Sequence, residues 1–73
     1  MKAFAGSRIL EARHVDGSGP VVLRQADDCY LVEWYDPWQE EHKALRSESE
    51  IESHLNFKRV VEGLEEGLRG DRS

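Results

Sequence analysis

The stretch Tyr30-Leu31-Val32-Glu33-Trp34-Tyr35 carries the strongest β-strand signal in this chain of 73 residues. All but two of its residues are β-branched or aromatic, the types that pleated strands favour. Side chains alternate along a strand, so the two faces of the sheet would hold different sets: Tyr30, Val32 and Trp34 on one, and Leu31, Glu33 and Tyr35 on the other. An unpaired buried carboxylate is costly, so the face with Glu33 is expected to be the outer one.

Three further stretches continue the strand pattern before and after this one: residues 8–15, 21–26 and 41–46. Turn signals separate the four stretches: Asp16-Gly17-Ser18-Gly19-Pro20, Asp27-Asp28 and Asp36-Pro37. Connections this short join neighbouring strands that run in opposite directions. The pattern therefore predicts a small antiparallel β-meander of three or four strands, in which the last, polar stretch is an edge strand.

From Ser47 onward the hydrophobic spacing changes from that of a strand to that of an α-helix. Either Ser47 with Glu50 or Ser49 with Glu52 fits the capping box that begins a helix. Glycines near the end weaken the helix, and fraying is expected beyond Glu66. Apolar residues recur at intervals of four, three and four positions, which places them on one stripe: Phe57, Val61, Leu64 and Leu68.

Together these patterns predict one α+β domain over residues 1–73. A sheet at about residues 3–46 would be followed by one C-terminal α-helix at about residues 48–68, packed on one face of the sheet. A chain this short buries only about 60% of the surface that its unfolded form exposes, so the core is expected to be small.

Ile51 and Leu55 do not fit the helical stripe that begins at Phe57. At about 100° per residue, they fall roughly 90–140° around the helix from that stripe. One interpretation is a bend near Asn56, which turns both halves of the helix toward the sheet. The other is a straight helix with a second apolar face that contacts another molecule.

Composition limits the chemistry that the chain could carry. The single cysteine, Cys29, cannot form an internal disulfide, and the preceding pair Asp27-Asp28 would oppose its activation as a nucleophile. The three histidines are not spaced like the ligands of a metal site. We therefore expect no cofactor, no metal site and no enzymatic activity.

No targeting or membrane segment is indicated. The longest apolar runs hold three residues, too few for a signal peptide or a membrane span. A lone cysteine also suits a reducing compartment. A cytoplasmic location without membrane contact is the expectation.

Negative charge is concentrated in the middle of the sequence. The chain has a net charge of −5, and residues 27–56 hold nine acidic residues against two basic ones, a net of −7. Such a field repels nucleic acid, whose binding requires phosphate neutralisation, and favours a basic partner. Direct binding of nucleic acid is therefore not expected.

Four of the six aromatic residues lie between positions 30 and 38, in the same acidic region. Trp38, in a polar turn, would either fold back over the sheet edge or be offered to a partner. Tyrosine and tryptophan are enriched where proteins bind one another, and carboxylates steer a basic partner. The predicted partner-binding residues are Glu33, Tyr35, Asp36, Trp38, Glu40 and Glu41.

These features favour a small acidic protein that inhibits a protein partner by occupying its basic, nucleic-acid-handling site. Anti-CRISPR proteins of phages and mobile elements act in this style, and the analogy is one of size and charge alone. The alternative is a structural or regulatory homodimer. Its contact would be the edge strand at residues 41–46 or the second helix face with Ile51 and Leu55.

Overall fold

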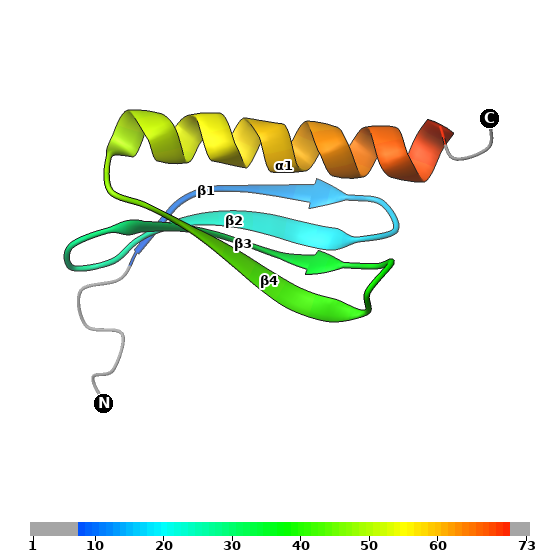
Figure 1. The fold of residues 1–73 in the computed structure, drawn as a ribbon, viewed down its shortest axis with the longest axis horizontal. Helices are drawn as coiled ribbons and strands as arrows, with labels where there is room; N and C mark the ends of the chain where they lie inside the picture. The colour runs from blue at the N-terminus through cyan, green and yellow to red at the C-terminus, as the bar shows by residue number, and fades with distance from the viewer. Residues whose placement is uncertain (1–7, 71–73) are drawn as a thin grey trace.

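The computed structural model describes residues 8–70 of the chain. It contains four strands and one helix: β1 (Arg8–Val15), β2 (Gly19–Gln25), β3 (Tyr30–Asp36), β4 (Glu41–Ser47) and α1 (Glu50–Gly70). The strands form one antiparallel sheet in the order β1-β2-β3-β4, and α1 lies along one face of it (Figure 1). The α+β fold predicted from the sequence, a β-meander followed by one helix packed on the sheet, is confirmed. The predicted sheet residues 3–7 lie outside the described residues.

The core lies between the sheet and the helix. Val32 of β3 is fully buried there, whereas Glu33 lies on the face opposite α1, which we call the open face. The alternation predicted for β3 is therefore confirmed. The helix contributes the predicted stripe, with Leu68 packed against its edge. Among the described residues, the buried hydrophobic cluster is Val15, Val21, Leu23, Val32, Phe57, Val61 and Leu64.

Of the two capping residues that the sequence offers, Ser49 begins α1. Its Oγ accepts a hydrogen bond from the backbone N–H of Glu52 at 3.1 Å, which satisfies an amide that has no partner within the helix. Ser47 instead ends β4 and is buried. Its Oγ accepts a hydrogen bond from Asn56 Nδ2 at 2.7 Å and so ties the end of the sheet to the helix.

Of the two interpretations of Ile51 and Leu55, the bend near Asn56 is wrong, because α1 is one uninterrupted helix that runs straight along the sheet (Figure 1). Ser53, not an apolar residue, takes the inward position in its first turns and is fully buried. Its hydroxyl is satisfied locally, since Ser53 Oγ donates to the backbone O of Glu50 at 2.7 Å. Ile51 and Leu55 consequently lie on the outer side of the helix, where they are 77% and 52% exposed.

The C-terminal end of α1 lies beside the two hairpin turns at one end of the sheet (Figure 1). Leu68 packs on the β1–β2 turn, where a Cβ on Gly17 would lie 3.3 Å from Leu68 Cδ1. Trp38, in the β3–β4 turn, packs on Gly67, where a Cβ would lie 2.8 Å from Trp38 Cη2. These contacts explain why the helix continues to Gly70 instead of fraying earlier.

β1 carries one extra residue, Leu10, where its pairing with β2 shifts between Ile9 and Glu11. Beyond this bulge the charged side chains of β1 lie on the helix side of the sheet. Arg13 Nη2, for example, lies 3.4 Å from Glu65 Oε2 of α1. This pair borders the core. Exposed ion pairs of this kind contribute about 0–1 kcal/mol, so this one adds little to the stability of the fold.

The hydrogen-bonded ladder between β2 and β3 ends at the pair Val22 and Glu33. It does not extend to Pro20, which has no N–H to donate. At this level Ser18 Oγ donates a hydrogen bond to the backbone O of Tyr35 at 2.6 Å. Ser18 is buried, so its hydroxyl closes the end of the core where the proline leaves no ladder bond.

Candidate protein-binding surface

Two of the six predicted binding residues, Glu33 and Tyr35, lie on the open face of the sheet. Glu33 Oε1 accepts a hydrogen bond from Arg24 Nε at 3.1 Å, which forms an ion pair between neighbouring strands. The ring of Tyr35 meets that of His42 edge to face, with the ring centroids 5.1 Å apart. Both side chains are half-buried and already have partners within the sheet.

Asp36 lies on the helix side of β3 and builds the β3–β4 turn. Its Oδ1 accepts hydrogen bonds from the backbone N–H groups of Trp38 at 2.8 Å and Gln39 at 3.0 Å. Lys43 Nζ lies 3.3 Å from Oδ2. The bond from the Gln39 amide, together with Lys43, holds the pKa of the Asp36 carboxyl below its ordinary value. With its side chain only 15% exposed, Asp36 supports the turn and offers little of its carboxylate to a partner.

Trp38 is both exposed and held in place. The sequence left two interpretations open, a ring folded back over the sheet edge or a ring offered to a partner. In the structure the far edge of the indole packs on Gly67 of α1, so the ring folds back onto the helix. The side chain nevertheless remains 56% exposed.

Two exposed carboxylates follow Trp38. Glu40 has a φ of 55°, in the left-handed region that residues other than glycine seldom adopt. This conformation costs a residue with a Cβ about 1 kcal/mol. Glu41 is exposed at the start of β4. We call the exposed set Trp38, Glu40 and Glu41 the turn patch.

The predicted binding residues thus divide between two faces of the sheet. Because side chains alternate along β3, Glu33 and Tyr35 face away from the side on which Asp36 lies. The turn patch keeps the other three together at the tip of the β3–β4 hairpin. Two signals in the sequence indicate this division. The alternation along the strand separates Glu33 and Tyr35 from Asp36, and in an Asp-Pro turn the aspartate commonly accepts hydrogen bonds from the turn amides.

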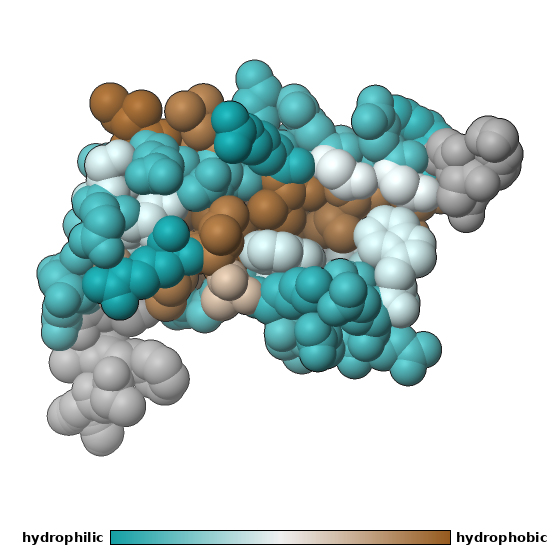
Figure 2. All heavy atoms as spheres, viewed as in Figure 1, coloured by the Kyte–Doolittle hydropathy of each residue, from teal (hydrophilic) through white to brown (hydrophobic). Residues whose placement is uncertain are grey.

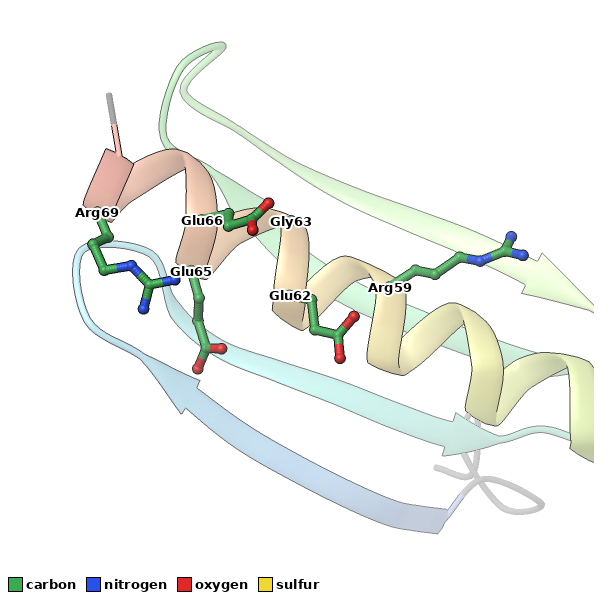
Figure 3. Close-up of a pocket in the computed structure, with 6 residues that line it drawn as sticks. All are labelled: Arg59, Glu62, Gly63, Glu65, Glu66 and Arg69. Carbon is green, nitrogen blue, oxygen red and sulfur yellow. The ribbon is translucent and has the colours of Figure 1, made fainter. Parts of the chain in front are cut away.

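A shallow hollow on the outer side of α1 was not indicated by the sequence. It arises at Gly63, where a Cβ would have no other atom within 4 Å. An open hollow with a charged lining suits a hydrated surface better than an apolar ligand. Its other lining residues carry charges of both signs: Arg59, Glu62, Glu65, Glu66 and Arg69 (Figure 3).

The remaining groups that could carry chemistry are buried or have simple partners. Cys29 is buried just before β3. His14 Nε2 lies 3.5 Å from Asp16 Oδ1, and His54 Nδ1 lies 3.6 Å from Glu11 Oε1. Among residues 8–70, no group of three or more His, Cys, Asp or Glu side chains is placed to hold a metal ion. In the same part of the chain, no helix is long and apolar enough to cross a membrane.

Comparison of the chain with models of protein families, with curated proteins and with solved structures found no match. Its function is therefore inferred from the geometry of its own residues.

Proposed function

We propose that this protein is not an enzyme and that it acts by binding another protein through the turn patch. The main support for this proposal is Trp38, which is more than half exposed and yet packed against Gly67. Exposed tryptophans are among the residues that contribute most to protein interfaces. A ring that is already fixed loses little conformational freedom when a partner covers it, and this favours binding.

Two contacts keep the ring in position. The turn that carries it is closed by the Asp36 carboxylate, which accepts the amides of Trp38 and Gln39. The helix beside it has a glycine, Gly67, at a place where a Cβ would collide with the indole. The ring is thus supported through its own backbone and along its far edge.

The carboxylates next to Trp38 favour a partner with a basic surface. Glu40 stands where glycine would adopt the same backbone conformation without strain, so the fold alone does not favour an acidic side chain there. The surrounding residues 27–56 carry a net charge of −7. Such a field speeds the approach of a basic partner and repels nucleic acid.

The sharper form of this proposal is an inhibitor that covers a basic, nucleic-acid-handling site of its partner. An acidic patch with a tryptophan at its centre complements such a site in charge and offers it an aromatic anchor. Anti-CRISPR proteins of phages and mobile elements remain an analogy of size and charge. The protein would act in the cytoplasm.

A pull-down from a lysate of the native host, read by mass spectrometry, tests the proposal. The wild type is compared with a variant that carries Trp38→Ala, Glu40→Lys and Glu41→Lys. A control variant carries Glu62→Lys and Glu66→Lys, which make the same change of charge on the outer side of α1. Circular dichroism checks that all three chains are folded. A partner kept by the wild type and the control but lost by the turn-patch variant supports the proposal.

Equal recovery by the turn-patch variant would refute it. Recovery should also fall when NaCl is raised to about 0.5 M, because salt at this level screens all but the closest charges. Recovery that salt does not change would remove the carboxylates from the mechanism. If the captured partner binds nucleic acid, an added oligonucleotide should compete with this protein, and absence of competition would rule out the inhibitor form.

A further inference from the structure

The outer side of α1 presents an apolar pair that nothing in the described chain covers. Ile51 and Leu55 lie one helical turn apart and are 77% and 52% exposed. Figure 2 shows hydrophobic side chains at the surface over the first turns of α1, apart from the band of core residues between helix and sheet. A straight helix with an apolar pair on its solvent side is the second of the two arrangements considered from the sequence.

Charges of opposite sign stand before and after Leu55 along the helix. Glu52 lies three residues before Leu55, and Lys58 and Arg59 lie three and four residues after it. All three charged side chains are exposed. None of them has an ion-pair partner among residues 8–70.

We propose that a second copy of this chain packs on this face, with the two α1 helices antiparallel about a two-fold axis beside Leu55. At about 100° per residue, Glu52 and Arg59 lie on one side of Leu55, and Ile51 and Lys58 lie on the other. An antiparallel pair therefore sets Glu52 of each copy beside Arg59 of the other. Ile51 of each copy is covered by the aliphatic stem of Lys58 of the other.

The same charges disfavour a parallel pair. A parallel two-fold pair exchanges the two sides of Leu55, so Arg59 of each copy would lie beside Lys58 of the other, and Glu52 would lie beside Ile51. The basic contacts would be repulsive, and Glu52 would have no base beside it. In the antiparallel arrangement the surface is self-complementary, as a two-fold interface requires. An acid before Leu55 and bases after it thus favour a second copy of the chain, in the antiparallel direction.

The edges of the sheet are less suited to self-association. The edge strand β1 is interrupted by the extra residue Leu10, and such bulges hinder the pairing of exposed strands. On the other edge, β4 directs the charge of Lys43 to the helix side, where it pairs with Asp36. Charges that point inward from an edge strand have the same effect.

The expected dimer is weak, because each copy contributes only two apolar side chains, whereas a standard interface buries about 800 Å² per partner. Sedimentation equilibrium of the full chain from about 10 µM to about 1 mM covers the range expected for so small a contact. The mass should rise toward twice that of the monomer across this range. A mass that stays monomeric at the highest concentration overturns the proposal and leaves the face to a different protein.

The Ile51→Ser, Leu55→Ser double variant should stay monomeric throughout. Ile9→Ser is the matched control, because Ile9 is also more than half exposed but lies on β1. It should associate like the wild type, as should Trp38→Ala, which separates this contact from the turn patch. A dimer that survives the double substitution overturns the proposal.

Charge exchange tests the direction of the helices. Glu52→Lys alone and Arg59→Glu alone should each weaken association by about tenfold, since each turns two attractive pairs into repulsive ones. The variant that carries both substitutions should recover the affinity of the wild type. In a parallel dimer Arg59→Glu would instead strengthen association, because the new carboxylate would lie beside Lys58 of the other copy, and that result would overturn the antiparallel arrangement. Circular dichroism of each variant confirms that only association has changed.

Discussion

Gly63 and Gly67 lie one turn apart in α1, but replacement of each by alanine should have opposite effects on stability. Gly63 is exposed, and a Cβ there would meet no other atom within 4 Å. Alanine is more favourable than glycine in a helix interior by about 0.8–1.0 kcal/mol. For a domain of this size, Gly63→Ala should therefore raise the melting temperature by about 4–8 °C.

At Gly67 the same backbone gain is opposed by Trp38. An added Cβ would lie 2.8 Å from Cη2 and 3.0 Å from Cζ2 of the indole, so the ring must move away from the helix. Trp38 hides a little under half of its surface, which amounts to roughly 100 Å², or about 2.5 kcal/mol at about 25 cal/mol per Å² if the ring detaches completely. With between half and all of this burial lost, Gly67→Ala should be less stable than the wild type by about 0–1.5 kcal/mol.

Urea unfolding followed by far-ultraviolet circular dichroism measures both variants, and tryptophan fluorescence reports the movement of the indole. The control is Gly67→Ala in a Trp38→Ala background. There the obstacle is gone, and the alanine should stabilise by about 1 kcal/mol, as it does at Gly63. Equal stabilisation by both alanines in the wild-type background would refute the reasoning. The ring would then not be held by the helix, and the turn patch would lose its support.

Three further substitutions test the turn and the end of the core. Glu40→Gly should raise the free energy of unfolding in urea by about 1 kcal/mol, because glycine adopts a φ of 55° without strain. The same substitution should weaken capture of the partner. A loss of stability would contradict the backbone argument. Asp36→Asn should lower stability at neutral pH. The folded state lowers the pKa of Asp36, so the contribution of its carboxylate is complete above the ordinary value of 3.8 and is lost as the pH falls through the lower folded value. The melting temperatures of wild type and Asp36→Asn should therefore converge in acid, and parallel curves would count against this assignment. Ser18→Ala should lower the free energy of unfolding in urea by about 1–2 kcal/mol, because it leaves the Tyr35 carbonyl without its buried donor. Ser53→Ala should lower it less, because the Ser53 hydroxyl bonds only within its own helix.

The strands and the helix could be predicted because their signals are local. β3 alternates between faces, and Phe57, Val61 and Leu64 follow the helical period, so each element indicates its buried side without knowledge of the others. Short turns then leave only antiparallel neighbours. These conditions are enough to specify a β-meander with one helix on it.

The sequence left a bend and a straight helix both open, and the bend was considered because apolar residues were assumed to be the buried ones. The sequence pattern gives Ile51 and Leu55 no place in the core of a straight helix, which suggested a change of direction. In the structure Ser53 fills the inward position instead, because a small hydroxyl that bonds its own helix can be buried at low cost. A pattern of hydrophobicity alone does not show this substitution.

The support of the turn patch could not be predicted, because it depends on contacts between distant residues. The sequence placed Trp38 and Glu40 in a polar turn but left open whether the Trp38 ring folds back or is offered to a partner, and in the structure both side chains are exposed. The contact between Trp38 and Gly67 joins a hairpin turn to the end of the helix. Gly67 was interpreted from the sequence only as a residue that weakens the helix, whereas its lack of a side chain is what admits the indole.

The contact between Trp38 and Gly67 also links the turn to the end of α1 thermodynamically. The last turns of a helix open and close in solution, and amide hydrogen exchange measures how often they do so. A partner that binds Trp38 only while the ring lies on the helix would reduce this opening by mass action. The amides of residues 67–70 should then exchange more slowly in the complex. Coupling of this kind is reciprocal, so a change that loosens the end of the helix lowers affinity for the partner without altering any residue that touches it.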